Sequence, residues 1–429
     1  MISTDELNLW YENNLVGYVW RNDLDRIGFR YDKDWLNNDF CFPVSLQLPL
    51  TEDEFSPDEG KAHRFFANLL PEGRARTNII SELKIADSDF ELLREIGGEC
   101  AGALSLLPVA DEPEQEHEYE ELTEDKLSEL IKGRGKIYYY RDNKKTTTRL
   151  SLAGAQNKCG VLLKDEKLLL PINEAPSSHI LKFQISDLKH VPAYETLLTH
   201  LAKQIGLAVV DVELCSLTGS PADDPDNTFI IIKRYDRIEG ENGKIHRLHQ
   251  EDFCQALGYG HEKKYQEKGG PSFADCINLI KASSDEPAID IESLLRWQIF
   301  NLLAGNSDGH AKNLSLLYQD TYSRRLSPFY DLVCTRAIEH IDTNLAFNIG
   351  GKHNPADINK GVWITFSKEC DLRSQYVLKT VNEFAEKILV FLPDTIDNFQ
   401  NAYGEYKALQ RVEQLIVKQC KRTLKSSCL

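Results

Sequence analysis

Two hydrophobic periods alternate along the first hundred residues. Segment LNLWYENNLVGYVWRN (residues 7–22) alternates apolar and polar positions around an Asn-Asn turn, which predicts two short strands. Segment AHRFFANLLPEGRARTNIISELK (62–84) has helical spacing with a break at Pro-Glu-Gly. Segment DSDFELLREIGG (87–98) has an Asp/Ser start signal and a Gly-Gly stop, so it predicts a short helix. We therefore expect a small N-terminal part rich in strands.

After this part, an acidic segment is followed by a basic one. Residues 111–125, DEPEQEHEYEELTED, contain nine acidic residues and no Lys or Arg, which indicates a solvated connector leading into a helix, and a domain boundary. Seven Lys or Arg residues follow between Lys132 and Arg149. They could form a nucleic-acid patch, but in so acidic a protein a solvated strand or mobile loop is the favoured interpretation.

Strand patterns dominate residues 150–236, and helical patterns dominate after Gly240. RLSLAGAQNKCGVLLKDEKLLLPI predicts strand, glycine loop, strand, turn and strand, whereas HILKFQI and FIIIKRYDR predict single strands. YETLLTHLAKQIG, IESLLRWQIFNLLAG and EYKALQRVEQLIVKQCKRTL are typical of helices. A strand-rich half followed by a helical half predicts two lobes. With the N-terminal part, the expected domains are residues 1–110, 111–237 and 238–429.

Composition narrows the class of protein. The 429 residues are enough for two or three domains, and the net charge of -17 argues against a large nucleic-acid footprint on this chain, although an acidic surface can receive a basic partner. The start has no secretory signal, and no apolar stretch is long enough to span a bilayer. The ten cysteines are scattered without a C-x-x-C pair, which favours reduced thiols. We expect a cytoplasmic protein without a membrane partner.

A polar interruption in NLLAGNSDGHAKNLSLL (301–317) carries the first candidate chemistry. Asp308 and Asn313 have the D-x-x-x-x-N spacing at which protein kinases place the Asp that accepts a hydroxyl proton and the Asn that holds Mg²⁺. Asp331, in RRLSPFYDLVCT, is where we expect a second metal carboxylate, at a strand end. Alone, this spacing occurs often by chance, and Asp331 could be a helix cap or a turn residue.

Candidates for the other parts of a phosphoryl-transfer site precede this loop in a sensible order. Gly154 and Gly160 lie in a loop between predicted strands and permit close backbone approach. Lys182 follows on a strand, and Glu195 in the next helix can pair with it. Alone, such a lysine is usually a solvated edge residue and Glu195 an ordinary helix-surface charge. The order of the whole set favours phosphoryl transfer.

Several departures separate the chain from ordinary protein kinases. The sequence AGAQNKCG is neither G-x-G-x-x-G nor a Walker A motif, and Asp331 is followed by Leu-Val instead of Phe-Gly. The loop SDGHAKN is not H-R-D, and its histidine follows the Asp by two positions. That arrangement is similar to D-R-H-x-x-N of phosphoinositide-kinase-like enzymes.

Six segments in order resemble the HipA family, the serine/threonine-kinase toxins of bacterial toxin–antitoxin pairs. They are RLSLAGAQNKCGVLL, SSHILKF, FIIIKRYDR, RLHQEDFCQALG, NSDGHAKNLSLL and LSPFYDLVCT, and FFANLLPEGRAR and LLREIGGECAGALSLLP resemble the family's N-terminal subdomain. The resemblance implies an α+β fold, in which a small β-rich subdomain precedes a two-lobed, phosphoinositide-kinase-like kinase with a mainly helical C-terminal lobe. It also implies ATP and Mg²⁺ as cofactors.

The resemblance carries over to individual residues. It implies Asp308 as the catalytic base, with Lys312 and His310 in the same loop: a loop lysine could stabilise developing charge, and the histidine could brace the loop through hydrogen bonds. It implies Asn313 and Asp331 as metal ligands. The residues implied to bind ATP are Ala153, Gly154, Ala155, Gln156, Lys158, Lys182, Glu195, Lys233 and Tyr235.

Regulation and partners are also implied by the resemblance. Ser151 matches the serine whose autophosphorylation inactivates the family's kinases; without the family, a buried serine ending a strand is the simpler interpretation. The family's partner is a helix-turn-helix antitoxin (HipB-like), through which operator DNA is mainly bound. Family substrates include aminoacyl-tRNA synthetases.

Four interpretations remain open. The first is an active protein-kinase toxin. The second is a small-molecule phosphotransferase with the same catalytic parts and a different acceptor. The third is a transcriptional co-repressor that has lost catalysis, against which the presence of Lys182, Asp308, Asn313 and Asp331 counts. The fourth is an interaction protein with a chance set of motifs.

Overall fold

A computed structural model gives the fold of the chain. It describes residues 5–135, 141–142, 145–146, 153–154, 156–217, 219–241, 243–320 and 323–427. The chain divides into two compact units, each built from segments that are separated in the sequence. The first contains Met1–Phe183, Lys233–His261 and Ser315–Arg324, and the second contains Gln184–Ile232, Glu262–Leu314 and Arg325–Leu429. The domain bounds expected at residues 110 and 237 stay a prediction.

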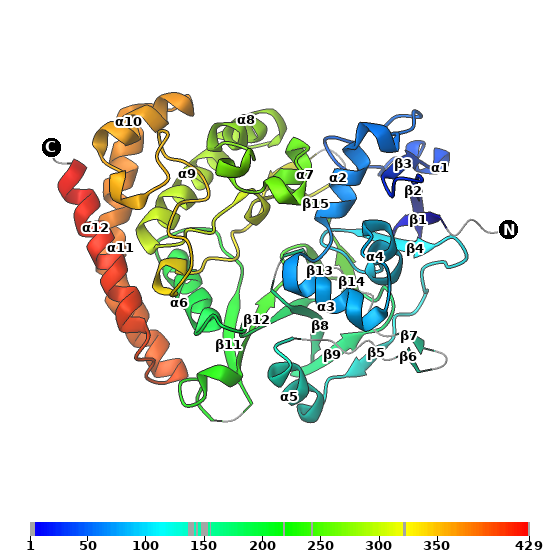
Figure 1. The fold of residues 1–429 in the computed structure, drawn as a ribbon, viewed down its shortest axis with the longest axis horizontal. Helices are drawn as coiled ribbons and strands as arrows, with labels where there is room; N and C mark the ends of the chain where they lie inside the picture. The colour runs from blue at the N-terminus through cyan, green and yellow to red at the C-terminus, as the bar shows by residue number, and fades with distance from the viewer. Residues whose placement is uncertain are drawn as a thin grey trace. The chain divides into compact units, whose positions relative to one another are not determined.

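The first unit begins with an antiparallel sheet in the order β3-β2-β1-β4 (Figure 1). The predicted turn is present between its first two strands, where Glu12 adopts a left-handed conformation with φ of 49°. Fully buried residues such as Leu7, Leu9 and Phe29 form the core of this sheet. Its strands are β1 (Glu6–Tyr11), β2 (Asn14–Arg21), β3 (Ile27–Tyr31) and β4 (Leu104–Pro108).

Helices accompany this sheet as the sequence predicts. The Pro-Glu-Gly break separates two helices, and the Ser88 side chain caps a third by accepting a hydrogen bond from the Glu91 N–H. The helices of the unit are α1 (Lys33–Leu36), α2 (Lys61–Asn68), α3 (Gly73–Leu83), α4 (Asp89–Ile96), α5 (Glu124–Lys132) and α7 (Phe253–Leu257).

The acidic segment 111–125 is more than a solvated connector, and in this respect the prediction is wrong. Its residues Tyr119–Glu121 form β5, which pairs antiparallel with β9 (Lys167–Pro171). The physical reason is Tyr119, whose ring is partly buried and whose hydroxyl donates to the Pro176 carbonyl at 3.0 Å. Beside β9 lie β8 (Lys158–Lys164) and then β10 (His179–Phe183), also antiparallel.

Short strands also follow Gly240, where the sequence indicates mainly helices. The β13 and β14 strands pair with each other, as do β15 and β16. Their bounds, and those of the other short elements, are β6 (Arg141–Asp142), β7 (Lys145–Thr146), β13 (Arg237–Glu239), β14 (Ile245–Arg247), β15 (Gln250–Asp252), β16 (Ser315–Tyr318) and β17 (Arg324–Leu326).

A buried network of charges ties two segments of the first unit together. Glu99 accepts hydrogen bonds from Arg234 and Arg237, each at 3.1 Å, and from the Ser177 N–H at 2.7 Å. The Asp236 carboxylate accepts a hydrogen bond from Arg234 at 2.8 Å. All four charged residues are at most 6% exposed. Burial opposes ionisation of Asp236, but the two arginines outweigh it and hold the pKa of this carboxyl well below its usual range.

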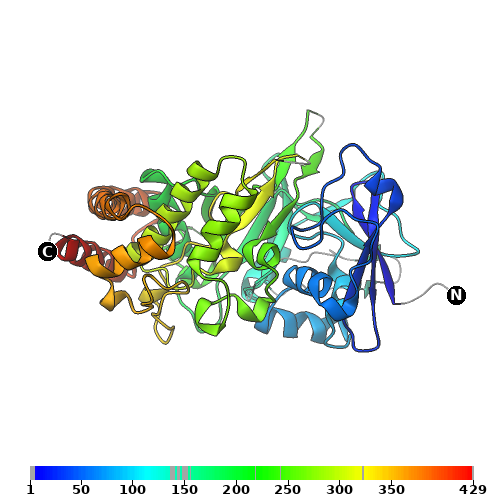
Figure 2. The same cartoon turned by 90° about the horizontal axis from the view of Figure 1, so that it is seen from above.

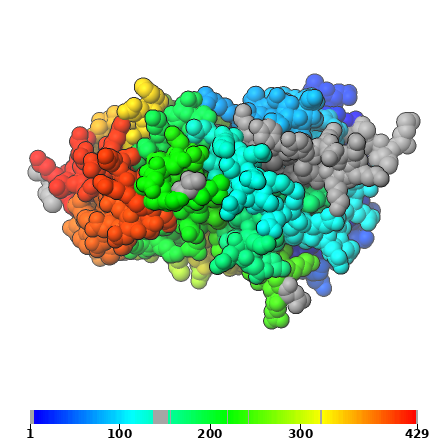
Figure 3. Space-filling model, turned by 90° about the horizontal axis from the view of Figure 1, so that it is seen from below, coloured from blue at the N-terminus to red at the C-terminus, as the bar shows by residue number. Residues whose placement is uncertain are grey.

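The second unit is mainly helical. In it, α11 packs against α6, α9, α10 and α12, and it runs beside α12 in Figures 1 and 2. Atoms of these last two helices cover a continuous area of the unit's surface in Figure 3. The elements are α6 (Val191–Gln204), β11 (Val212–Ser216), β12 (Thr228–Lys233), α8 (Phe273–Ser283), α9 (Pro287–Ala304), α10 (Lys360–Glu369), α11 (Ser374–Tyr403) and α12 (Leu409–Ser427).

Two further facts bear on the class of protein. Within the described residues, none of the helices combines the length and the apolar character needed to cross a membrane. The nine cysteines of the described part are all free thiols, and burial raises the pKa of several, such as Cys159 and Cys334, to about 12. Such thiols stay protonated and behave as small apolar side chains.

Candidate active site

The polar loop that follows α9 is shaped by a glycine. Gly305 ends the helix in a left-handed conformation, with φ of 77°, and its N–H donates to the Asn301 carbonyl. The chain then runs without regular structure to a 3-10 turn at Ala311–Asn313. The loop side chains Asn306 and Ser307 are at most 5% exposed, whereas Asp308 is exposed. One accessible carboxylate therefore stands on a buried polar support.

Residues that the sequence analysis missed make up this support. The Asn306 side chain accepts the Asp308 N–H at 3.1 Å and donates to the Asn301 side chain at 3.0 Å. The Ser307 N–H donates to Thr335 Oγ1 at 2.8 Å. The contact with Asn301 lies within the local sequence, but the contact with Thr335 spans 28 residues and leaves no local pattern.

A tyrosine that the sequence analysis also missed contacts the predicted catalytic base. The Tyr265 hydroxyl donates to Asp308 Oδ1 at 2.6 Å, and its ring meets the His310 imidazole edge to face, with centroids 5.2 Å apart. The predicted loop residues His310 and Lys312 are 6% and 7% exposed, respectively. The Lys312 carbonyl accepts the Tyr330 hydroxyl at 3.0 Å. Asp308, His310 and Lys312 thus lie in one supported loop of the second unit, and Tyr265, from another segment of that unit, contacts this loop.

The two predicted metal ligands lie in the same unit. Asn313 Nδ2 donates to the Asp308 carbonyl at 3.1 Å, so the amide is oriented with its oxygen as the remaining side-chain acceptor. Asp331 has a left-handed backbone with φ of 61°, a conformation in which non-glycine residues are uncommon and often functional. It lies in no strand, contrary to expectation. It follows only an isolated bridge between Phe329 and Val209.

These two oxygen donors suit Mg²⁺ better than they suit a metal ion that is coordinated by protein side chains alone. No group of three or more His, Cys, Asp or Glu side chains within the described residues could hold a metal ion. Mg²⁺ needs no such cage, because it prefers oxygen and is usually bound through one or two carboxylates plus substrate phosphates. One amide oxygen from Asn313 and one carboxylate from Asp331 provide that type of donor set.

Gly154 is held by backbone contacts within the first unit. The Gly154 carbonyl accepts the Glu72 N–H at 3.0 Å, and Gly154 forms a parallel bridge with Pro71. Gly154 has φ of 118°, a backbone conformation that residues with a Cβ rarely adopt, so the position favours glycine. Lys158 Nζ donates to the Ala153 carbonyl at 2.7 Å.

Other predicted ATP-binding residues have varied environments. Gln156 Nε2 donates to the Phe183 carbonyl at 2.6 Å. Lys182 on β10 is 4% exposed and Glu195 on α6 is 2% exposed; they belong to different units, and their pairing stays a prediction. Ala155 and Ser151 lie outside the described residues.

The segment at the end of β12 mixes an accessible side chain with buried ones. Lys233 is exposed, and the Tyr235 hydroxyl donates to the Gln250 side chain. Arg234 and Asp236, on either side of Tyr235, belong to the buried charge network. That role leaves no local pattern in the sequence, because Arg234 pairs with Glu99, which lies more than a hundred residues away.

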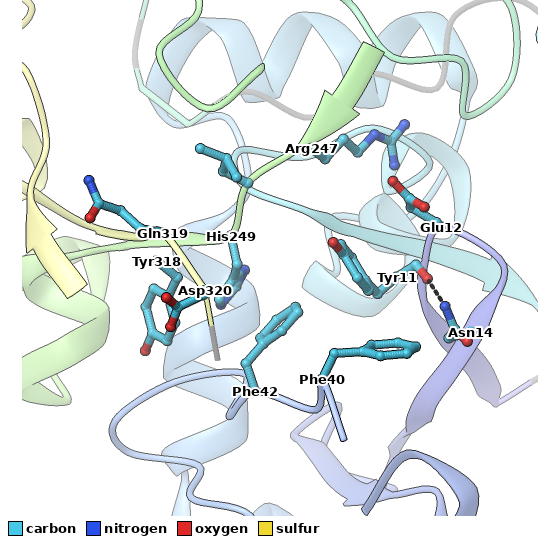
Figure 4. A pocket seen from close by; sticks show the side chains of 11 residues that line it. Tyr11, Glu12, Asn14, Phe40, Phe42, Arg247, His249, Tyr318, Gln319 and Asp320 are labelled. Atoms are coloured by element: carbon cyan, nitrogen blue, oxygen red, sulfur yellow. Dashed lines mark hydrogen bonds between the residues drawn. The ribbon is translucent and has the colours of Figure 1, made fainter. Parts of the chain in front are cut away.

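A separate cavity of about 310 Å³ lies within the first unit (Figure 4). Two of its lining side chains pack together: the His249 imidazole stacks on Phe42 with centroids 4.9 Å apart, and its Nε2–H donates a hydrogen bond to the Val44 carbonyl at 2.8 Å. Burial lowers the pKa of His249 to about 4. None of the predicted site residues lines this cavity. Its lining residues are Tyr11, Glu12, Asn14, Phe40, Phe42, Arg247, Leu248, His249, Tyr318, Gln319 and Asp320.

Comparisons with known proteins agree on one family. The sequence matches the family model of the HipA-like C-terminal domain over residues 150–390 and that of the HipA N-terminal domain over residues 7–107. "Putative kinase Y4mE" of Sinorhizobium fredii is 37% identical over 91% of this chain and 93% of that protein. "Serine/threonine-protein kinase toxin HipA" of Shewanella oneidensis is 27% identical over 91% of each.

A solved structure shows the same fold. The Shewanella oneidensis MR-1 HipA, in a complex with HipB and its operator DNA, matches with a TM-score of 0.83 and 23% identity over 98% of each chain. The expected α+β class, with a β-rich N-terminal part and a helical C-terminal part, is confirmed by this match.

Proposed function

The chain belongs to the HipA family, and from this premise we propose that it is an ATP-dependent serine/threonine protein kinase and the toxin of a toxin–antitoxin pair. One observation carries the kinase proposal. Asp308 is an exposed carboxylate on a loop whose other polar residues are buried, with Asn306 and Asn313 hydrogen-bonded to its backbone. The relatives of this chain that are named as kinases support the same activity.

In the proposed reaction, Asp308 accepts the proton of the acceptor hydroxyl while phosphate is transferred. Asn313 and Asp331 would hold Mg²⁺, which neutralises charge on the phosphates when it is bound. Lys312, in the same loop, stabilises the charge that develops on the transferred group. His310 braces the loop through its ring contact with Tyr265.

ATP is proposed to be held by the residues that the family resemblance implies. The glycine loop contains Gly154, whose backbone conformation favours glycine, and a residue without a Cβ permits close approach to phosphates. Lys182 would bind phosphate with Glu195 orienting it, and Lys233 and Tyr235 would meet adenine. The loop residues in this proposal are Ala153, Gly154, Ala155, Gln156 and Lys158.

Phosphorylation of Ser151 is proposed to switch the enzyme off. A phosphate group adds about -1.5 to -2 charges next to a loop that itself approaches the phosphates of ATP, so repulsion would displace the loop. This proposal rests on the family resemblance and on the sequence around Ser151.

The proposed partner is a DNA-binding antitoxin. The net charge of -17 makes direct DNA binding by this chain unfavourable and favours a basic partner. The similar HipA chain is found in a complex with HipB and operator DNA. The proposed substrate is a translation-related protein such as an aminoacyl-tRNA synthetase, which would place the activity in the cytoplasm.

The test is intact-mass and phosphopeptide analysis after dephosphorylated protein is incubated with Mg²⁺-ATP. Wild type should gain one phosphate at Ser151, and Asp308→Ala should gain none. Asp357→Asn, which alters another exposed carboxylate of the same unit, should behave as wild type. If ATP binds but neither wild type nor a protein acceptor gains phosphate, the kinase proposal is lost in favour of an inactive co-repressor or a phosphotransferase for small molecules.

A further inference from the structure

We propose that Tyr265 is a positioning residue for the base Asp308, which it orients through its hydroxyl. This inference rests on the proposed kinase function. The two side chains come from segments 43 residues apart, and their 2.6 Å hydrogen bond joins a phenol donor to a carboxylate oxygen. Hydrogen bonds to an ionised acceptor are stronger and more directional than neutral ones.

The backbone around Tyr265 is fixed on both sides. The Lys264 carbonyl accepts the Ala311 N–H, which belongs to the catalytic loop itself, at 3.4 Å. On the other side, the Gln266 N–H donates to the Ala346 carbonyl at 3.2 Å, and the Gln266 side chain accepts the Asn348 N–H at 2.8 Å. The tyrosine is therefore attached to the loop that it is proposed to orient.

The ring of Tyr265 is held as well as its backbone. It meets the buried His310 imidazole at an interplanar angle of 87°. The ammonium groups of Lys264 and Lys268 lie 5.6 Å and 5.1 Å from the ring centroid, within the range of cation–π attraction. A phenol held in this way can restrain a flexible neighbour at little further cost in conformational entropy.

Asp308 is a side chain that needs such a restraint. Its backbone is fixed at both ends, because Asn306 accepts its N–H and Asn313 donates to its carbonyl. Its carboxylate is exposed, however, and an exposed side chain samples several rotamers. The Tyr265 hydroxyl engages Oδ1, so Oδ2 is left to face the acceptor hydroxyl. A general base must come within about 2.6–3.2 Å of the proton that it removes, so this orientation should affect the rate directly.

The opposite role would give an effect of the opposite sign. A hydroxyl bonded to the base could instead occupy the place of the acceptor hydroxyl and compete with the substrate. Removing a competitor would raise the rate or lower the KM for the acceptor. Removing a positioning group lowers kcat, because the base is correctly placed for a smaller fraction of the time.

The experiment compares Tyr265→Phe with wild type and with Tyr376→Phe, a tyrosine of α11 that is 39% exposed. Phosphate incorporation at saturating Mg²⁺-ATP is measured on the chain itself and on dephosphorylated casein, together with the KM for ATP and the melting temperature. We expect Tyr265→Phe to lower kcat by about tenfold to a hundredfold. The KM for ATP and the melting temperature should stay unchanged, and Tyr376→Phe should match wild type in every measurement.

The outcomes separate the two levels of the proposal. Equal or faster turnover by Tyr265→Phe, in an active wild-type background, overturns the positioning role and leaves the kinase function standing. A fall in kcat that comes with a lower melting temperature or a raised KM for ATP also overturns it, because that pattern indicates a general structural role. If wild type phosphorylates neither acceptor, the kinase function fails and this inference fails with it.

Discussion

The molecule contains two clusters of polar residues that differ in how their charges are buried and paired. The cluster of Glu99, Arg234, Asp236 and Arg237 consists of full charges that are buried and paired with one another. The loop around Asp308 has mostly neutral polar groups buried beneath one exposed charge. Both interrupt apolar segments.

The difference shows that burial distinguishes charges that stabilise the fold from a charge that is accessible to a substrate. The charges of the Glu99 cluster are paired with one another, so freeing one of them for a substrate would carry a large energetic cost. An exposed carboxylate on a rigid support is accessible and already oriented. The first cluster should therefore matter for stability, and the second for turnover. Substitutions in the two clusters test this division.

The largest effect is expected for Asp308→Asn. The amide keeps the size of the carboxylate but is a far weaker base, so the rate of phosphate incorporation should fall by about 10²–10⁴-fold. The free energy of unfolding of the Asp308→Asn variant, measured with urea, should match that of wild type because the side chain of residue 308 is exposed. A large loss of stability would contradict the division, since it would make Asp308 part of the support.

Glu99→Gln should show the reverse behaviour. It leaves Arg234 and Arg237 buried with one carboxylate fewer, and breaking a buried pair typically costs about 3–5 kcal/mol. The matched control is Glu339→Gln, which breaks an exposed pair with Arg411 and should cost about 0–1 kcal/mol. Urea unfolding followed by fluorescence measures both. Similar stabilities for the two variants would show that burial does not set the importance of these charges.

Glu251 tests an intermediate case, a buried carboxyl that is held by neutral donors. Burial raises its pKa to about 7, although hydrogen bonds from Ser45 and Tyr318 act in the opposite direction. Between the unfolded value of 4.5 and about 7, the folded state keeps a proton that the unfolded state loses. Its contribution to stability is thus fully present below the lower value and is lost as the pH rises through the higher one, by about 3 kcal/mol.

Glu251→Gln removes this titration. The free energy of unfolding is measured with urea at each pH. Between pH 5 and pH 8 the variant should lose about 3 kcal/mol less of this free energy than wild type loses. Arg324 is the nearby charge that favours the ionised form of Glu251, so the difference should grow when Arg324 is neutralised as well. Parallel pH profiles for wild type and variant would contradict the raised pKa.

Local features could be predicted from the sequence, and contacts between distant segments could not. The turn after β1, the break between α2 and α3 and the cap at Ser88 depend on neighbouring residues, and all three are confirmed. Asp308 and Asn313 were found because their spacing is local, and the structure joins them through one hydrogen bond. Their catalytic and metal-binding roles stay predictions.

The missed features share one cause, which is a partner far away in the chain. Tyr265 stands in a lysine-rich segment without a motif, and only folding brings it to Asp308. Arg234 lies between Lys233 and Tyr235, which the family resemblance implies as ATP-binding residues, and its partner Glu99 is 135 residues away. Likewise, β5 was hidden in an acidic segment because its strand partner, β9, lies about fifty residues downstream.

The smallest effect is expected at Gly309, where support and chemistry meet. A Cβ at this position would lie 2.5 Å from Asn301 Nδ2, so Gly309→Ala must displace the buried Asn301 side chain. That side chain accepts from Asn306, which in turn holds the Asp308 N–H, so the displacement should reach the base. We expect a loss of about 1–2 kcal/mol in unfolding free energy and a fall in kcat of about tenfold. The control Gly361→Ala, in helix α10 where only the Asn359 side chain lies nearby, should leave both unchanged or raise stability slightly. Full activity in a destabilised Gly309→Ala protein would show that the support holds the loop together without setting the position of its carboxylate.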